Sequence, residues 1–126
     1  MKLHLTHTAG QNLITAYDTG AIVVNGQRQT RSLILGAETL FPWAVSSLSA
    51  MPAEALRALL DLSPELVLLA EGDALQLPSS AIQAQLTAPF HAAGIGVEIL
   101  SVPAACRVWN YLVAEGRKVA AGFVLG

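Results

Sequence analysis

The chain has 126 residues, of which 53% are hydrophobic and 13% are charged, and its formal net charge is −2. The length fits one domain, and the 7 Lys and Arg residues are scattered, which argues against nucleic acid as a partner. The sequence has no run of about 18 apolar residues and no signal or transit pattern, so we expect a soluble, cytoplasmic protein that does not span a membrane.

The charged fraction is low, because soluble domains usually contain about 25% charged residues. Such a composition indicates a large core, an apolar surface or a protein partner, and it would suit a homodimer. The single cysteine, Cys106, excludes an intrachain disulfide and fits a reducing compartment.

The first third of the sequence is typical of β-structure. Residues 13–17 and 21–24 predict two short strands. The Asn-Gly pair at 25–26 is a strong signal for a two-residue hairpin, with residues 27–30 as the return arm. Residues 31–36 predict a further strand. We therefore expect an N-terminal antiparallel hairpin as an addition to the main sheet.

The pattern changes after residue 36. The stretch Phe41-Pro42-Trp43 predicts an irregular crossing, because its large apolar residues show no helical or strand face. Pro52 fits the first position of a helix, and the leucine spacing that follows predicts a helix that ends at Ser63-Pro64.

The second half of the chain alternates strands and helices. Apolar runs at 66–70, 96–100 and 118–125 predict strands, and the first two are typical of strands covered on both faces. Alternation of this kind predicts parallel βαβ units with helices packed on the sheet. Because no linker or repeat interrupts the pattern, we expect an α/β fold with residues 1–126 as a single domain.

Two helices connect these strands. Ser80 and Gln83 form a candidate capping box for the first helix, which should run to about His91. The second helix begins at Pro103 and ends at Gly116, where glycine suits the left-handed position that closes a helix.

The helix from residue 103 has one apolar side, on which Trp109 is the largest residue and should pack against the sheet. Glu115 lies at the C-terminal end of this helix, where the helix dipole disfavours a carboxylate. We therefore expect Glu115 to have a hydrogen-bond or ion-pair partner, such as Arg117 or Arg107.

This C-terminal segment resembles a known family. Residues 97–100, the helix residues 104–107 with Asn110, and residues 115–121 are similar to the closing signature of a small family of uncharacterised domains that includes the mitochondrial NADH dehydrogenase (complex I) assembly factor 3. The hairpin and the strand at 32–35, followed by Trp43, resemble the first half of that family.

The resemblance implies a three-layer α/β domain with a mixed sheet. It also implies an assembly-factor-like role through protein–protein contact, and the family brings no established catalytic reaction. The chain departs from the family at Ser101-Val102, where Asp-Thr is usual, and at Val108, where Thr is usual. These positions follow a strand end, where a ligand would bind, so the departures weaken the case for a retained small-molecule site.

Three short patterns have both a chemical and a structural interpretation. Asp18-Thr19-Gly20 matches the tripeptide of aspartic proteases, but those enzymes pair two aspartates, so a strand-ending turn is favoured. His4 and His7 lack the converging ligands of a metal site, and His91 is distant. Cys106 lies near a helix N-terminus, yet cysteine is more often a buried apolar residue. From these patterns we predict no catalytic residue and no metal site.

No glycine-rich nucleotide fingerprint is present. Gly72 follows a predicted strand, but Glu71 and Asp73 flank it and would repel phosphate. We therefore predict no cofactor.

A polar rim is the candidate ligand site. In open α/β sheets, ligands bind beyond the carboxyl ends of the strands. If the strands at 66–70 and 96–100 are adjacent and parallel, one rim would gather Glu71, Asp73, Ser101, Arg107 and Asn110. The alternative interpretation of these residues is a salt-bridged helix end.

Two functional hypotheses follow. The first is a non-enzymatic protein-interaction domain whose apolar partner surface includes Leu40, Phe41 and Trp43. The second is a small-molecule binder or weak enzyme that uses the polar rim. We favour the first hypothesis and expect a protein partner. An enzymatic activity is less favoured than its absence.

Overall fold

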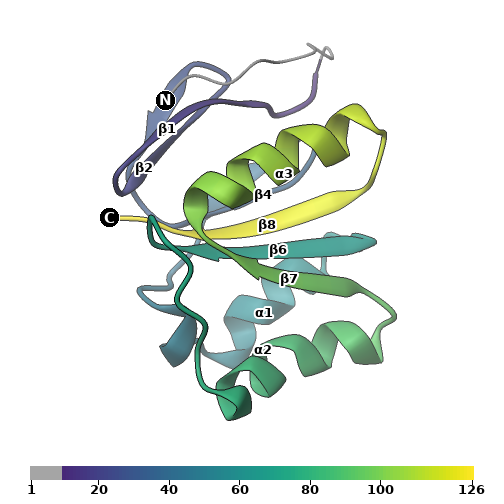
Figure 1. The fold of residues 1–126 in the computed structure, drawn as a ribbon. Coiled ribbons are helices and arrows are strands. Elements are labelled where there is room, and N and C mark those ends of the chain that lie inside the picture. The colour runs from purple at the N-terminus through teal and green to yellow at the C-terminus, as the bar shows by residue number, and fades with distance from the viewer. Residues whose placement is uncertain (1–9) are drawn as a thin grey trace.

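The computed structural model describes residues 10–126, which form two sheets and three α-helices (Figure 1). The smaller sheet is antiparallel and has the strand order β1-β2-β3, with bounds Ile14–Asp18, Ala21–Val24 and Gln27–Gln29. The predicted hairpin at residues 25–26 is confirmed, because β2 and β3 pair across it and Gly26 has a φ of 82°.

The larger sheet has five strands in the order β5-β4-β8-β6-β7. Strands β6 (Leu66–Glu71), β7 (Gly96–Leu100) and β8 (Val119–Val124) pair in parallel, as the apolar runs predict. Strand β4 (Leu33–Leu35) pairs antiparallel with β8, and β5 (Leu40–Pro42) pairs antiparallel with β4. The expected α/β class with a mixed sheet is therefore confirmed.

The helices cover both faces of the five-stranded sheet. The helices α1 (Ala53–Leu60) and α2 (Ser80–Ala92) lie on one face, and α3 (Val102–Ala114) lies on the other (Figure 1). The small sheet packs against the outer side of α3 (Figure 1). The N-terminal hairpin thus belongs to a sheet of its own, and β4 and β5 are the antiparallel additions to the main sheet.

Strand β6 shows why both faces are buried. Val67 and Leu69 point to the α1–α2 side, whereas Leu68 and Ala70 point to the α3 side, and all four side chains are fully buried. The alternation along one strand therefore divides the core into two apolar clusters, one on each face.

The sequence signals of α3 are confirmed. The Ser101 hydroxyl accepts a hydrogen bond from the Ala104 amide at 3.3 Å, which caps the helix. Gly116 follows the helix with a φ of 75°. Trp109 is fully buried among residues of the α3-side cluster, and its indole N–H donates to the Asn12 carbonyl at 2.9 Å. The tryptophan thus joins α3 to the segment before β1.

Two local predictions are wrong. Residues 40–42 form strand β5 rather than an irregular crossing, because Leu33 to Leu35 offer them a strand to pair with. The cap of α2 is Ser79, one residue before the expected Ser80, and the Gln83 side chain donates to the Pro78 carbonyl. Helix α2 is therefore capped as expected, but its cap lies one residue earlier than predicted.

Candidate functional site

The backbone of the predicted polar rim is assembled as expected. Ala70 pairs with Leu100, so the residues that follow β6 and β7 lie together at the carboxyl ends of the parallel strands. The Val102 amide donates to the Gly72 carbonyl at 2.8 Å, which joins the start of α3 to the end of β6.

The side chains of the rim nevertheless have separate partners. The Glu71 carboxylate accepts a hydrogen bond from the Leu48 amide at 3.0 Å, on the 3₁₀ turn η1 (Leu48–Ala50). Ser101 is used as the cap of α3, and Asp73 is exposed in the loop after β6. Glu71 therefore positions the segment before α1.

The other two rim residues contact the small sheet. An Arg107 guanidinium N–H donates to the Tyr17 hydroxyl at 3.1 Å. The Asn110 side-chain amide accepts from the Ile14 amide at 2.9 Å and donates to the Ile14 carbonyl at 2.8 Å. Asn110 thus binds β1 as a neighbouring strand would. The structure does not direct the five predicted side chains into one pocket, and ligand binding by them stays a prediction.

Cys106 lies inside the α3-side cluster and is fully buried. Burial raises the pKa of its thiol from 9.0 to about 12, and the Arg107 guanidinium opposes part of that rise. The position agrees with the structural interpretation of this cysteine.

The Cys106 thiol should not react with an alkylating reagent at about pH 8 in the native protein, and it should react fully in denaturant, because only a thiolate is nucleophilic. The folded pKa lies above the unfolded one, so the free energy of unfolding should fall as pH rises from 9.0 to about 12. Mass spectrometry after timed alkylation measures the first effect. Modification of the native protein at the rate of the unfolded chain would contradict it.

The other short patterns singled out in the sequence are the Asp18-Thr19-Gly20 tripeptide and the histidines. Asp18-Thr19-Gly20 forms the β1–β2 turn, in which the Thr19 amide donates to Asp18 at 2.8 Å. His4 and His7 lie outside the described residues. Within residues 10–126, no group of three or more His, Cys, Asp and Glu side chains could hold a metal ion, and no helix is long and apolar enough to cross a membrane.

Arg117 has a different partner from the one expected. Its guanidinium forms an ion pair with Glu65 at 2.8 Å, and the Lys118 amide donates to the same carboxylate oxygen at 2.9 Å. The hydrogen bond from Arg117 and that from Lys118 lower the pKa of Glu65. The suggested pairing of Arg117 with Glu115 is therefore wrong.

The three residues of the predicted partner surface are divided between surface and core. Leu40 is 38% exposed and Phe41 is half-buried on β5. Trp43 is 5% exposed, and its indole N–H donates to the Ala55 carbonyl at 3.0 Å. The indole lies on Gly122, where an added Cβ would come within 2.6 Å of it. Trp43 is thus buried, whereas Leu40 is exposed, and partner binding by Leu40, Phe41 and Trp43 stays a prediction.

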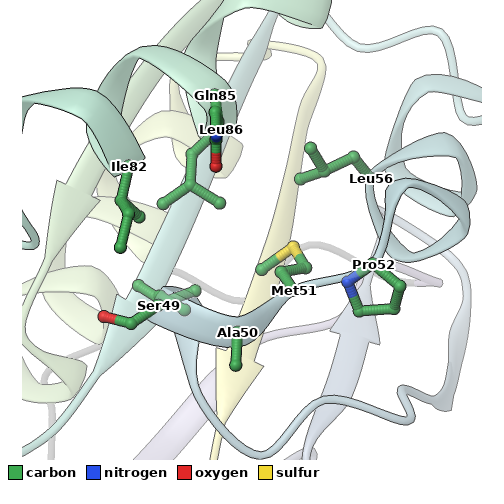
Figure 2. A pocket seen from close by; sticks show the side chains of 9 residues that line it. Ser49, Ala50, Met51, Pro52, Leu56, Ile82, Gln85 and Leu86 are labelled. Carbon is green, nitrogen blue, oxygen red and sulfur yellow. The ribbon is translucent and has the colours of Figure 1, made fainter.

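The structure adds a groove that the sequence did not predict (Figure 2). It has a volume of about 380 Å³ and lies between two walls. One wall is the segment from η1 to α1, and the other is α2. The lining residues are Leu48, Ser49, Ala50, Met51, Pro52, Leu56, Ile82, Gln85 and Leu86.

Met51 lies at the centre of this groove. Its thioether points between Leu56 of α1 and Leu86 of α2, and Ile82 lies further along the α2 wall (Figure 2). Polar side chains in the lining come from Ser49 and Gln85. A flexible, polarisable methionine can adapt to different apolar surfaces. The arrangement is chemically suited to contact with apolar side chains.

Two large apolar side chains lie on the loop that leads into the α2 wall. Leu75 is 52% exposed and Leu77 is 55% exposed.

Leu48, on the wall opposite α2, is held in place by the carboxylate of Glu71, which accepts a hydrogen bond from its amide. A predicted rim residue thus supports the groove indirectly, through the backbone of the turn that lines it.

Comparison with protein families and curated proteins gives consistent matches. Residues 14–124 match the model of a family described as protein of unknown function (DUF498/DUF598). NADH dehydrogenase (ubiquinone) 1 alpha subcomplex assembly factor 3 from Bos taurus is 28% identical over 113 residues, and the Homo sapiens protein is 26% identical. These alignments cover 88% of this chain and 59% of the relatives, so the chain spans about 59% of their length.

Two solved bacterial structures are similar over nearly the whole chain. The crystal structure of a protein from Bordetella parapertussis has a TM-score of 0.82 and 30% identity, and it covers 95% of this chain and 100% of its own. The NMR structure of a protein from Xanthomonas campestris has a TM-score of 0.78 and 33% identity, and it covers 100% of this chain and 93% of its own.

Proposed function

This chain belongs to the DUF498/DUF598 family of proteins of unknown function, and we propose that it is a non-enzymatic protein-interaction domain with an assembly-factor-like role. The observation that carries the proposal is the apolar groove centred on Met51. The names of the assembly-factor relatives support a role in bringing proteins together. We place this role in the cytoplasm, as the sequence predicts.

The groove suits an apolar segment of another protein. Its walls are mostly aliphatic, with Ser49 and Gln85 as the polar side chains, and Leu75 and Leu77 are further exposed apolar residues on the loop before α2. Apolar side chains exposed together are a common mark of protein–protein interfaces. A partner that inserts apolar side chains beside Met51 would remove this surface from water.

Substitution of Met51→Glu should reduce partner capture at least about tenfold, because a carboxylate in an apolar interface loses its hydration. The double substitution Leu75→Ser with Leu77→Ser should also reduce capture. The measurement is affinity purification of the tagged protein from its own cells, with quantitative mass spectrometry of the proteins retained. Circular dichroism verifies that each variant is folded.

Tyr111→Ser provides the matched control, because Tyr111 is also a large exposed side chain, at 66%, but lies on α3 on the opposite face of the main sheet. It should retain the captured proteins. Arg107→Ala tests the polar rim, and the proposal expects it to retain them as well. Equal capture by wild type, the Met51 variant and the double variant would refute the proposal.

A further inference from the structure

Strand β7 forms one edge of the five-stranded sheet, with β6 on its inner side (Figure 1). Unlike β6, it is accessible along its length. Gly96 and Glu98 are exposed, and Val97, Ile99 and Leu100 are half-buried. The helices on the two faces of the sheet therefore leave this edge open.

The outward backbone groups of β7 belong to Val97 and Ile99. The Gly96 amide donates inward to the Glu65 carbonyl at 3.2 Å. Because backbone groups alternate in direction along a strand, Glu98 also faces β6, whereas Val97 and Ile99 face away from it. Among the described residues no hydrogen bond is found on that outer side. The edge thus offers two amides and two carbonyls to an incoming strand.

The other sheet edges in residues 10–126 are protected. Strand β5 has three residues and includes Pro42, which has no amide hydrogen. On β1, the Asn110 side chain occupies the amide and carbonyl of Ile14. Strand β3 also has three residues and carries the charged, exposed Arg28. Short, charged or proline-containing edges resist strand addition. Strand β7 is longer and has no proline, and Glu98 is its charged residue.

The side chains of β7 define what could pair with it. Val97 and Ile99 pack with the α1–α2 cluster, whereas Glu98 pairs with Leu68 and shares its face, the α3 side. An antiparallel strand would place one residue opposite Glu98 and its two neighbours beside Val97 and Ile99. The incoming strand that best suits β7 therefore has a basic residue between two apolar residues.

Full-overlap pairing with a second copy of the chain is unfavourable at this edge. Antiparallel self-pairing with full overlap pairs Val97 with Ile99 of the other copy in both directions. That register places the two Glu98 carboxylates directly opposite each other, which is destabilising. The carboxylate thus disfavours a homodimer in this register and favours a basic residue opposite Glu98 in a partner strand.

We propose that β7 receives an antiparallel strand with an apolar–basic–apolar sequence from another protein. Strand addition of this kind draws its affinity from main-chain hydrogen bonds and its specificity from the alternating side chains. The inference rests on the proposed function, since it names the partner segment, but the edge is a separate surface from the groove around Met51.

The test uses a blocked peptide with a Val-Lys-Val centre as the probe, and a peptide with a Val-Glu-Val centre for comparison. Amide hydrogen exchange, measured by NMR, should slow at Val97 and Ile99 when the lysine peptide is added at millimolar concentration. The Glu98 amide, already paired with β6, should change little. Unchanged exchange at Val97 and Ile99 overturns the proposal.

Glu98→Lys should weaken binding of the lysine peptide about tenfold, since an attractive cross-strand pair becomes a repulsive one, and should favour the glutamate peptide instead. Glu38→Lys is the matched control, because Glu38 is exposed between β4 and β5 at the opposite sheet edge; it should leave both affinities unchanged. Equal effects of the two substitutions would contradict a pairing at Glu98.

Two further measurements separate this inference from the proposed function. Met51→Glu should leave peptide binding at β7 intact even if it abolishes partner capture through the groove. Sedimentation should show no self-association through β7 in the wild type. A wild-type dimer that dissociates on Glu98→Lys would show that a second copy, and not a partner strand, occupies the edge.

Discussion

Replacing Trp109 with alanine should lower the free energy of unfolding by about 3–5 kcal/mol, the usual cost of removing a buried aromatic side chain. Trp109 is fully buried in the α3-side cluster, and its indole N–H also binds the Asn12 carbonyl. Urea denaturation followed by circular dichroism measures the change. A loss of this size is a large share of a typical domain stability of about 5–15 kcal/mol.

Tyr111→Ala is the control for this prediction, because it removes an aromatic ring from the same helix where the ring is 66% exposed. Its effect should lie within about 0.5 kcal/mol, as for most surface substitutions. Similar destabilisation by both variants would contradict the packing of α3 between the two sheets.

Replacing Asn110 with leucine should lower the free energy of unfolding by about 2–4 kcal/mol, because two backbone groups of Ile14 would lose their hydrogen-bond partners. Ile14 itself is fully buried, so water cannot readily replace the amide. Asn110→Asp should also be destabilising, since a carboxylate cannot donate to the Ile14 carbonyl. Urea denaturation measures the loss, and the exchange rate of the Ile14 amide should rise.

Arg107→Ala is the comparison for Asn110. The guanidinium is exposed and its hydrogen bond to Tyr17 lies at the surface, so the substitution should cost less than about 1 kcal/mol. If Asn110→Leu were neutral while the Ile14 amide kept its slow exchange, the side chain would not be holding β1, and its assignment to a ligand site would regain support.

The parallel strands of the main sheet and helix α3 could be predicted because their signals are local. The apolar run of β6 and the cap and glycine stop of α3 lie within a few residues of the elements they define. The site of Trp43 could not be predicted in this way. The space for its indole is created by Gly122, on a strand at the other end of the chain, and by the carbonyl of Ala55.

The candidate site depended on contacts that no spacing rule supplies. The prediction that Glu71 and Ser101 follow neighbouring strand ends is correct, because paired parallel strands end together. It could not show that Asn110 binds Ile14, 96 positions away. The groove escaped prediction for the same reason, since Met51 and Leu86 meet only when α1 and α2 pack side by side. The available signal was Leu75 and Leu77, two large apolar residues in the loop between β6 and α2.

The most direct test of the interaction surface is site-specific photo-crosslinking in living cells. A photoreactive phenylalanine analogue replaces Met51, at the centre of the groove, or Tyr111, on α3. We predict a discrete covalent adduct with another protein from position 51 and none from position 111. No adduct from position 51, or the same adduct from both positions, would contradict a partner seated in the groove.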